Sequence, residues 1–502
     1  MVDEAHERSL SSDILLGLLK KIRNKRTELR IIISSATLDA ENFLRFFIDG
    51  SNETVHSNGT PSVSDIGRII SLEGRMFPVD IQYLPEPAED YVEQAVQTVF
   101  DIHTTQPEGD ILLFLTGRDE IESTIDEISE RMHHLRPGTQ IVQPLPLYAG
   151  LPTDQQMYVF EPAAENTRKV IISTNIAEAS VTIDGIVYVI DCGFVKLRAC
   201  NPKTGIETLT PVPISKASAT QRTGRAGRTK AGKCYRLYTE SAYERLAEAT
   251  VPEIQRSNLA PVILQLKDLG IDNIVRFDFI TPPPSELVVR GLEMLYSLGA
   301  LDDYARLTKP LGVRMAALPL QPMLSKALLQ APAFGCLSEM LTIAAMMALQ
   351  SPVWISHDGG KKQQESARRK FAVEEGDHLT LLNVYQSFVT KGKKESKWCH
   401  DHFLNFKSLT KAISIRNQLR KHLERLIDVS DDRSGAPVVS APAVEKGEKL
   451  RRCLTTGFFA HAAKMLPDGS FQTVDGGTEL WAHPSSLMFV SITHSVKKRL
   501  QS

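Results

Sequence analysis

The stretch that decides the fold runs from Asp110 to Met132 and reads DILLFLTGRDEIESTIDEISERM. Its first six residues, Asp110–Leu115, are mostly apolar, as in a strand of a buried parallel sheet. A short turn, Thr116–Arg118, follows, and Asp119–Met132 then has the apolar spacing of a helix. A strand, a turn and a helix in this order form the repeating unit of a doubly wound α/β fold.

The same alternation extends to both sides of this stretch. The apolar spacing predicts helices at 11–26 and 91–103 and strands at 31–33, 140–143, 169–173 and 186–191. The alternation breaks at 195–210, where turn-forming residues at Asn201–Gly205 separate two arms that read as a hairpin. The expected fold class is therefore α/β, with doubly wound domains in the first half of the chain.

Beyond Tyr238 the alternation stops and helices dominate. We expect helices at 258–269, 285–298, 325–349 and 379–388. Short strand-like runs at 301–303 and 307–308 are typical of the strand pair of a winged helix. The polar stretch 428–448 carries Ser, Gly and Pro and predicts a loop or linker, and 451–502 reads as part of a small β domain.

Composition narrows the class of protein. A chain of 502 residues is too long for one core, so several domains are expected. Lys and Arg number 58 against 60 Asp and Glu, so any nucleic-acid binding must use a local groove. Six cysteines without paired spacing indicate a reduced, intracellular protein, and the spacing of Cys399–His402 fits no structural zinc site. No apolar run approaches the ~20 residues of a membrane span.

A row of arginines is the main candidate for binding a ligand. Residues 221–228 read QRTGRAGR. On a helical turn, Gln221, Arg225 and Arg228 would share one face, and forked cationic donors in a row suit a polyphosphate. The alternative is an exposed basic helix face without a ligand.

Residues near the amino terminus supply the complementary chemistry. Asp3, Glu4 and His6 belong to the stretch DEAH, whose carboxylates suit a divalent metal ion and an attacking water. Alone, this stretch could equally be an exposed helix start. Ser35 and Thr37, in the stretch SAT, follow the predicted strand at 31–33.

Taken in this order, the three stretches resemble motifs II, III and VI of the DEAH-box RNA helicases. The resemblance implies that Asp3 binds Mg²⁺ and nucleotide, that Glu4 activates water, and that His6 bonds across to a second domain. It implies that Ser35 and Thr37 couple the domains. It also implies that three residues act on the phosphates of ATP during catalysis: Gln221, Arg225 and Arg228.

Further stretches resemble other motifs of the same family. Residues 174–180 (TNIAEAS) resemble motif V, which implies RNA-backbone contacts for Thr174 and Asn175 and a nucleotide or metal-shell role for Asp184. Residues 115–117 resemble motif IV, which implies that Thr116 and Gly117 touch RNA. Two positions depart from the family pattern: Ala179, where threonine is usual, and Arg118, where glutamine is expected.

An aromatic residue completes the nucleotide-binding set. Phe160 resembles the residue that stacks on adenine in the family, although a lone Phe is more often part of a core. A second stretch must be set aside: residues 227–234 (GRTKAGKC) nearly match a P-loop. Cys234 lacks the terminal hydroxyl of that loop, and the residues after it read as a strand rather than a helix.

The resemblance covers most of the chain and implies five parts. These are the end of a first RecA-like domain (1–76), a second RecA-like domain (77–243), a winged helix (244–324), a helical ratchet domain (325–428) and a partial OB-fold (429–502). The hairpin at 195–210 resembles the wedge that lies beside RNA in this family. RNA is therefore the expected polymer partner, and no membrane partner is expected.

The function expected from the resemblance is an ATP-dependent RNA helicase, with ATP as substrate and Mg²⁺ as cofactor. Family members often act in pre-mRNA splicing, so we expect a nuclear location, spliceosomal partners and a glycine-rich activator. The family's P-loop lies ahead of the acidic motif, where this sequence has nothing, so we expect a truncated helicase that hydrolyses little ATP alone. The alternative is a non-catalytic short form that binds RNA or a partner.

Overall fold

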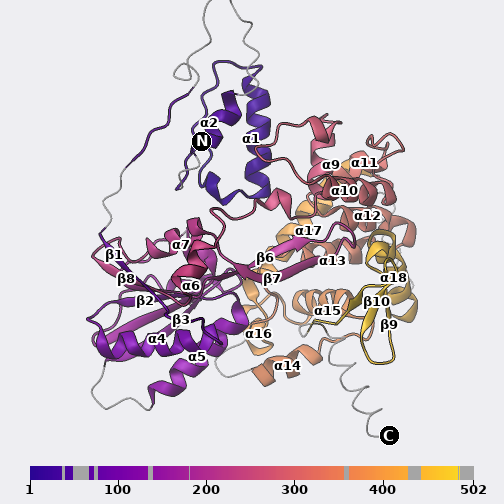
Figure 1. Ribbon diagram of the computed structural model, residues 1–502. Helices are drawn as coiled ribbons and strands as arrows, with labels where there is room; N and C mark the ends of the chain where they lie inside the picture. Colours follow the sequence, from indigo (N-terminus) through magenta and orange to yellow (C-terminus); the bar gives the residue numbers. More distant parts are fainter. Residues whose placement is uncertain are drawn as a thin grey trace, which may run out of the picture. The chain divides into compact units, whose positions relative to one another are not determined.

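The computed structural model describes residues 1–36, 40–48, 67–72, 77–133, 140–179, 181–355, 361–427, 443–483 and 486 (Figure 1). The chain divides into two compact units. The first comprises Met1–Asn201, Glu207–Ser257 and Phe277–Pro284, and the second comprises the remaining segments. Thr37 and Ser180, which the sequence placed in functional motifs, lie outside the described residues.

The first unit is built on a six-stranded sheet in which every neighbouring pair is parallel. The strands run in the spatial order β1 (Val79–Tyr83), β8 (Gly232–Arg236), β5 (Ile186–Asp191), β2 (Asp110–Phe114), β4 (Thr167–Ser173) and β3 (Ile141–Leu147). The central strand β5 is buried along its whole length, as expected of a sheet covered on both faces. The α/β fold class predicted from the sequence is confirmed.

Alternating residues of β2 supply the two cores of this sheet. Ile111 and Leu113 pack on one face with helices α4 (Tyr91–Thr105) and α5 (Arg118–Met132), while Leu112 and Phe114 belong to the core on the other face. The remaining helices of this region are α6 (Thr153–Met157), α7 (Lys216–Thr223) and α8 (Glu240–Glu244). Because Gly232–Cys234 belong to β8, the near-match to a P-loop leads into a strand and not into the helix that a P-loop requires.

The amino-terminal segment contains helices α1 (Leu10–Arg23) and α2 (Ala40–Ile48). The predicted strand at 31–33 is reduced to a single parallel bridge between Val2 and Ile33. Two backbone hydrogen bonds of 2.8 and 2.9 Å hold this bridge. The bridge brings the residues that follow Val2 alongside those that follow Ile33.

The predicted hairpin is present as β6 (Phe194–Cys200) and β7 (Glu207–Pro213). The strands pair antiparallel from Phe194 opposite Pro213 to Cys200 opposite Glu207 (Figure 1). Gly205 in the connecting turn has a φ of 69°, a backbone conformation that glycine adopts without strain. This explains why a turn signal in the sequence located the hairpin correctly.

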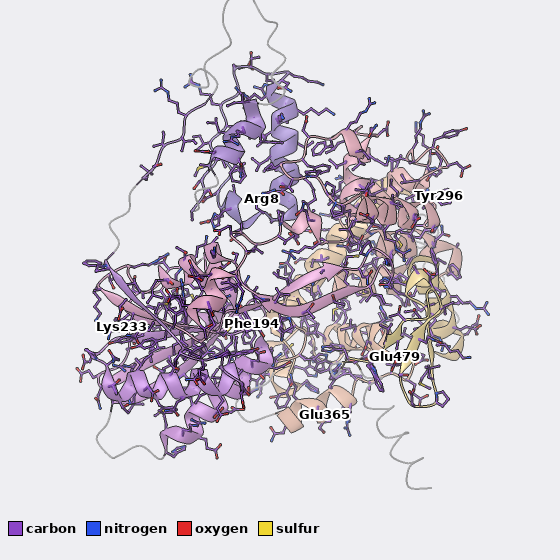
Figure 2. All side chains as sticks on the ribbon, viewed as in Figure 1. Arg8, Phe194, Lys233, Tyr296, Glu365 and Glu479 are labelled. Carbon is purple, nitrogen blue, oxygen red and sulfur yellow. The ribbon has the colours of Figure 1, made fainter. Side chains whose placement is uncertain are left out.

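The second unit is helical. Its helices are α9 (Ala260–Asp268), α10 (Ser285–Ser297), α11 (Leu311–Ala316), α12 (Pro322–Gln330), α13 (Leu337–Met347), α14 (Lys361–Arg369), α15 (Asp377–Thr390), α16 (Ser396–Asp401), α17 (Phe406–Leu426) and α18 (Ala443–Phe458). Leu301 and Leu307 form an antiparallel bridge where the sequence predicted a strand pair. In Figure 2, Tyr296 marks α10 and Glu365 marks α14.

Two sequence predictions for this unit were wrong. The helix expected at 325–349 is two helices, because Pro332 lies in a 3₁₀ turn between α12 and α13 that Gly335 closes with a φ of 64°. Of the loop expected at 428–448, residues 443–448 belong instead to α18, and residues 428–442 lie outside the described residues. Helix α18 buries Leu450 and Cys453 in one core with α12 and α13.

A small antiparallel sheet follows α18. Its strands are arranged in the order β11 (Glu479–Leu480), β10 (Phe471–Thr473) and β9 (Ala463–Met465). The short strands predicted here are therefore present, while the OB-fold and the five domain boundaries stay predictions. Among the described residues, no helix is both long and apolar enough to span a membrane. All six cysteines are buried, and none of them forms a disulfide bond.

Candidate functional site

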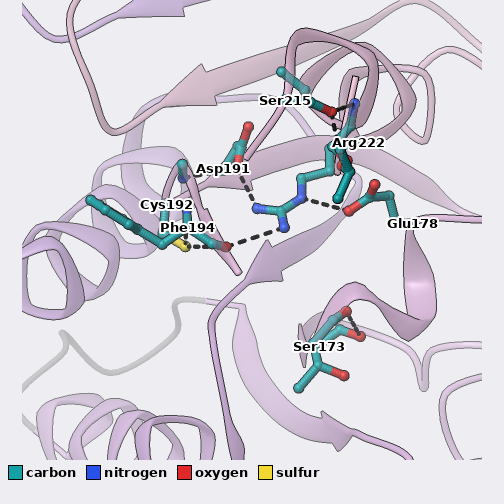
Figure 3. Close-up of polar contacts among 12 residues, drawn as sticks. Ser173, Glu178, Asp191, Cys192, Phe194, Ser215 and Arg222 are labelled. Carbon is teal, nitrogen blue, oxygen red and sulfur yellow. Dashed lines mark hydrogen bonds and ion pairs between the residues drawn. The ribbon is translucent and has the colours of Figure 1, made fainter. Parts of the chain in front are cut away.

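The centre of the site in the first unit is Arg222, on α7, whose side chain is only 1% exposed. Its guanidinium donates to Glu178 Oε2 at 3.0 Å, to Asp191 Oδ1 at 2.7 Å and to the carbonyl of Phe194 at 3.2 Å (Figure 3). This network joins α7, the end of β5, the start of β6 and the 174–180 stretch. The arrangement fixes the ends of these elements with respect to one another.

The network holds a buried positive charge. Burial alone would lower the pKa of Arg222, but the carboxylates of Asp191 and Glu178 outweigh this effect and raise it. Asp191 also accepts hydrogen bonds from Gly193 N–H and Tyr238 O–H, each at 3.0 Å. Sequence reasoning had not assigned a role to Arg222, Glu178 or Asp191. The sequence did contain signals for two of them, because Arg222 lies inside the arginine row and Asp191 ends a predicted strand.

The arginine row is not a helical face as the sequence predicted. Helix α7 ends at Thr223, and residues 224–227 form turns. Gln221 therefore lies on the helix, whereas Arg225 and Arg228 lie beyond it. A side chain at Gly227 would come within 2.6 Å of the Phe77 carbonyl, so the close approach of this turn to β1 requires glycine.

The turn nonetheless brings Arg225 and Arg228 to one place. Arg225 donates to the carbonyls of Val181 at 2.9 Å and Ala179 at 3.1 Å, and also to that of Glu178. The Arg228 guanidinium donates to the hydroxyl of Thr182. The arginine row thus contacts the 178–182 segment at Glu178, Ala179, Val181 and Thr182, and the first two of these belong to the predicted 174–180 stretch.

Among the described residues, neither of these two arginines forms a close ion pair, although the carboxylates of Glu178 and Glu4 act on Arg225 from farther away. Burial, together with the positive charge of Arg228, lowers the pKa of Arg225 to about 10. Within the described part of the chain, neither guanidinium lies within 4.0 Å of a carboxylate, because Glu178 pairs with Arg222 instead. Two adjacent cations that form no close ion pair are suited to bind a phosphate group.

Other predicted nucleotide-binding residues lie at the surface. Asp184 is exposed in the turn before β5. Phe160 is 44% exposed, which excludes the alternative that it is an ordinary core residue. Gln221 is half-buried on α7. The roles of these three residues stay predictions.

The predicted RNA-binding residues follow two neighbouring strands. Thr116 and Gly117 come after β2, and Thr174 and Asn175 come after β4, which pairs directly with β2. Because the carboxyl ends of parallel strands meet at one edge of a sheet, these four residues share that edge. Thr116 itself is buried, and its hydroxyl donates to Oε1 of Glu120, in the first turn of α5, at 2.6 Å.

A cation that sequence reasoning missed lies at this edge. Lys196 comes from β6, and its Nζ would be 2.6 Å from a Cβ placed on Gly117. Gly117 precedes α5, and its missing side chain leaves the room that the lysine occupies. Only the fold brings residues 117 and 196 together, so no local sequence signal could have shown the pair.

The amino-terminal stretch forms a separate cluster. Ala5 N–H donates to the carbonyl of Ser34 at 3.0 Å, and Ala36 N–H donates to Nδ1 of His6 at 3.1 Å. Since Nδ1 accepts, the proton of neutral His6 is on Nε2, which lies 3.4 Å from Glu4 Oε2. The structure therefore brings Glu4 and His6 beside Ser34–Ala36, and Ser35 lies within that segment. The predicted bond from His6 to another domain stays a prediction.

Asp3 is the residue that would hold Mg²⁺. Its carboxylate is exposed and accepts a 3.0 Å hydrogen bond from Glu4 N–H. Mg²⁺ commonly binds one or two carboxylates and takes its other ligands from phosphates and water, so this single carboxylate fits. The described residues contain no cluster of three or more His, Cys, Asp or Glu side chains that could hold a metal ion without such ligands.

Comparison with known proteins identifies three parts of the chain. Residues 93–230 match the helicase conserved C-terminal domain. Residues 291–320 match the winged-helix part of the helicase associated domain, and residues 321–381 match its ratchet-like part. These matches confirm the winged helix and the helical ratchet predicted from the sequence.

Relatives from three animals are similar over nearly the whole chain. The human "Probable ATP-dependent RNA helicase DHX35" is 51% identical over 491 residues, which cover 97% of this chain and 67% of the human protein. The Pongo abelii protein of the same name is 51% identical, with 97% and 66% covered, and the Caenorhabditis elegans homologue is 50% identical, with 94% and 62% covered. The chain thus spans about two thirds of the length of these relatives. It belongs to the DEAH-box family of ATP-dependent RNA helicases.

Proposed function

We propose that this chain is part of an ATP-dependent RNA helicase that uses nucleoside triphosphate hydrolysis to move along or remodel RNA. The observation that carries the proposal is the pair Arg225 and Arg228, both bound to the 178–182 segment and neither paired with a carboxylate in the described residues. Such a pair is suited to stabilise the charge that develops on a transferred phosphoryl group.

The proposed division of roles follows from the two halves of the site. In the second RecA-like region, Arg225 and Arg228 contact the phosphates, while Gln221, Phe160 and Asp184 complete the nucleotide contacts. In the amino-terminal cluster, Asp3 holds Mg²⁺, which polarises the phosphates when bound, and Glu4 orients the water. His6 and Ser35, together with Thr37, transmit the state of the nucleotide between domains.

RNA is proposed to bind at the strand edge that carries Gly117 and Thr174. Backbone amides and small side chains at the ends of β2 and β4 suit an RNA sugar-phosphate backbone. Lys196 supplies a positive charge at the same edge, and its strand β6 belongs to the hairpin that resembles the family's wedge. These contacts carry no base information, so little sequence preference is expected.

The cellular setting is proposed from the family resemblance alone. We propose that the protein acts in the nucleus, in pre-mRNA splicing, with spliceosomal proteins and a glycine-rich activator that binds the winged helix and the OB-fold. Affinity purification from nuclear extract, with and without ribonuclease, tests this setting. Recovery of no splicing component under either condition would refute it.

The decisive experiment measures RNA binding and ATP turnover on the same preparation. The chain should bind single-stranded RNA with an affinity that falls as salt rises, because phosphate contacts release counterions. RNA-stimulated ATP hydrolysis that is lost in Arg228→Ala supports the motor function. RNA binding without hydrolysis, in any form that carries an upstream P-loop, would instead favour the non-catalytic alternative.

A further inference from the structure

A second site candidate lies in the helical ratchet region, apart from the residues already assigned. It is a cavity of about 190 Å³, lined by residues of α15 and α16 and of the segments beside them: Lys370, Phe371, Asn383, Ser387, Lys391, Trp398 and His402. A cavity of about 150 Å³ accommodates a benzene ring. This cavity is therefore large enough for one aromatic heterocycle but too small for a whole nucleotide.

One wall of the cavity is aromatic. The rings of Trp398 and His402 stack with centroids 4.3 Å apart, and Phe371 meets Trp398 edge-on at 6.0 Å. Gly392 allows this packing, since a Cβ there would come within 2.6 Å of the Trp398 ring. Flat aromatic walls of this kind favour flat ligands with a π-system.

The polar groups of the cavity include two hydrogen-bond acceptors whose orientation is fixed. The amide nitrogen of Asn383 donates to the Phe371 carbonyl at 2.9 Å, which leaves its Oδ1 as an acceptor. His402 Nδ1 is 2.8 Å from the Trp398 carbonyl, so Nδ1 carries the proton and Nε2 is the acceptor. Ring and exocyclic N–H groups of a nucleobase are matching donors.

Two lysines border the cavity. Lys370 and Lys391 line it and are both exposed, and none of its seven lining residues is acidic. Residues 361–411 contain eleven Lys and Arg against six Asp and Glu, a net charge of +5 in a chain whose total is −2. An aromatic cavity bordered by lysines suits a base that carries a phosphate.

We propose that this cavity binds one nucleobase, with the attached phosphate held by Lys370 and Lys391. The ligand is either a free nucleotide or one nucleotide of a single-stranded RNA, since both present the same chemistry. The RNA source deepens the proposed function and rests on it, whereas the free-nucleotide source does not. The site would give the ratchet region a contact to a base in addition to the backbone contacts at the strand edge.

The test uses the whole chain and two probes, a mononucleotide series (AMP, CMP, GMP and UMP) and a single-stranded RNA dodecamer. Trp398 is one of three tryptophans, so binding should quench part of the intrinsic fluorescence. Lys370→Glu combined with Lys391→Glu should weaken mononucleotide binding at least tenfold. The matched control, Lys411→Glu with Lys421→Glu, makes the same charge change at exposed positions outside the cavity lining and should stay within twofold.

The RNA arm locates the contact. The same double substitution should reduce the salt slope of dodecamer binding by about 0.7, the loss of one phosphate contact on a single strand. A dodecamer containing 4-thiouridine should crosslink to the peptide around Trp398. If mononucleotides quench the fluorescence but the RNA does not bind, the ligand is a free nucleotide. That result would support the proposed cavity site and would contradict the proposed RNA helicase function.

Two results would overturn the inference. The first is that no mononucleotide quenches the fluorescence, while RNA still binds and crosslinks only to residues before 258. In that case the proposed function stands and the cavity has no such ligand. The second is that the cavity variant and the control variant weaken binding equally, because then only the general basic charge matters.

Discussion

Arg222 and Asp191 form an ion pair of 2.7 Å in which the two side chains are 1% and 0% exposed. Two other arginines of the same motif, Arg225 and Arg228, have different surroundings. Arg225 is half-buried against backbone carbonyls, and Arg228 is exposed. One eight-residue motif thus contains an arginine that holds the fold and two that can reach a ligand.

Removing the buried member of the motif should unfold the domain more easily. Arg222→Ala leaves Asp191 and Glu178 as buried carboxylates without their cation, a change that costs about 3–5 kcal/mol of unfolding free energy. Urea denaturation of both proteins measures the difference. Arg228→Ala is the matched control, and its effect should be within about 1 kcal/mol because the side chain is exposed. Equal effects of the two substitutions would contradict this assignment.

The exposed arginine should matter for catalysis instead. In a form of the protein that carries the family's upstream P-loop, Arg228→Ala should lower RNA-stimulated ATP turnover by about 10³–10⁵-fold, the range for an arginine finger. Thermal unfolding of the same sample should be nearly unchanged. Arg225→Ala should lower turnover and also stability, since it removes hydrogen bonds to Val181 and Ala179. Normal turnover in Arg228→Ala would remove that residue from the catalytic set.

The sequence predicted the strands and helices of the first unit well because their signals are local. A buried parallel strand such as β5 is an apolar run, and the hairpin turn requires glycine at a positive φ, so both can be read from neighbouring residues. The prediction that residues 224–228 continue the helix was wrong. The turn there is set by the approach of Gly227 to the carbonyl of Phe77, a residue that is distant in sequence.

The candidate site was predictable only in part for the same reason. Residue types in motifs identified Arg225 and Arg228 as a ligand-binding pair, and the structure brings them to one segment. The carboxylates that pair with Arg222 belong to residues remote from it in sequence. The same is true of Lys196, which the fold brings beside Gly117. Such contacts leave no periodic pattern.

RNA binding should depend on Lys196. Lys196→Glu should weaken binding of single-stranded RNA and reduce the salt slope by about 0.7, as expected when one phosphate contact is lost. Arg198→Glu, two residues along the same strand and more exposed, makes a control with the same charge change. Filter binding at several salt concentrations gives both slopes. An unchanged slope in Lys196→Glu would show that this lysine does not touch a phosphate.

Stability should fall in mild acid because of two partly buried histidines. Burial lowers the pKa of His103 and of His378 below the ordinary value of 6.5, so the unfolded chain binds protons more readily than the folded one. The contribution of these two histidines to the free energy of unfolding is then fully present above about pH 6.5. It is lost as the pH falls through that value toward the pKa of the folded state. Melting temperatures between pH 7.5 and 5.5 measure the loss.

Substitutions test whether a buried histidine causes the pH dependence of the melting temperature. His378→Gln should make the melting of the second unit less dependent on pH in this window, since it removes a group that protonates on unfolding. His422→Gln, at an exposed position on α17, should leave the pH dependence as in the parent chain. A parent chain whose melting temperature is flat from pH 7.5 to 5.5 would rule out the effect.

The position of α18 decides where this protein can be divided for study. A side chain at Gly457 would come within 2.0 Å of the Met323 carbonyl, so the helix lies directly against α12 and covers Leu324 and Leu328. A recombinant fragment that stops at residue 427 would expose this leucine surface to water and tend to aggregate or be digested. One that continues through Phe458 would keep it covered, and the soluble yields of the two fragments would differ accordingly.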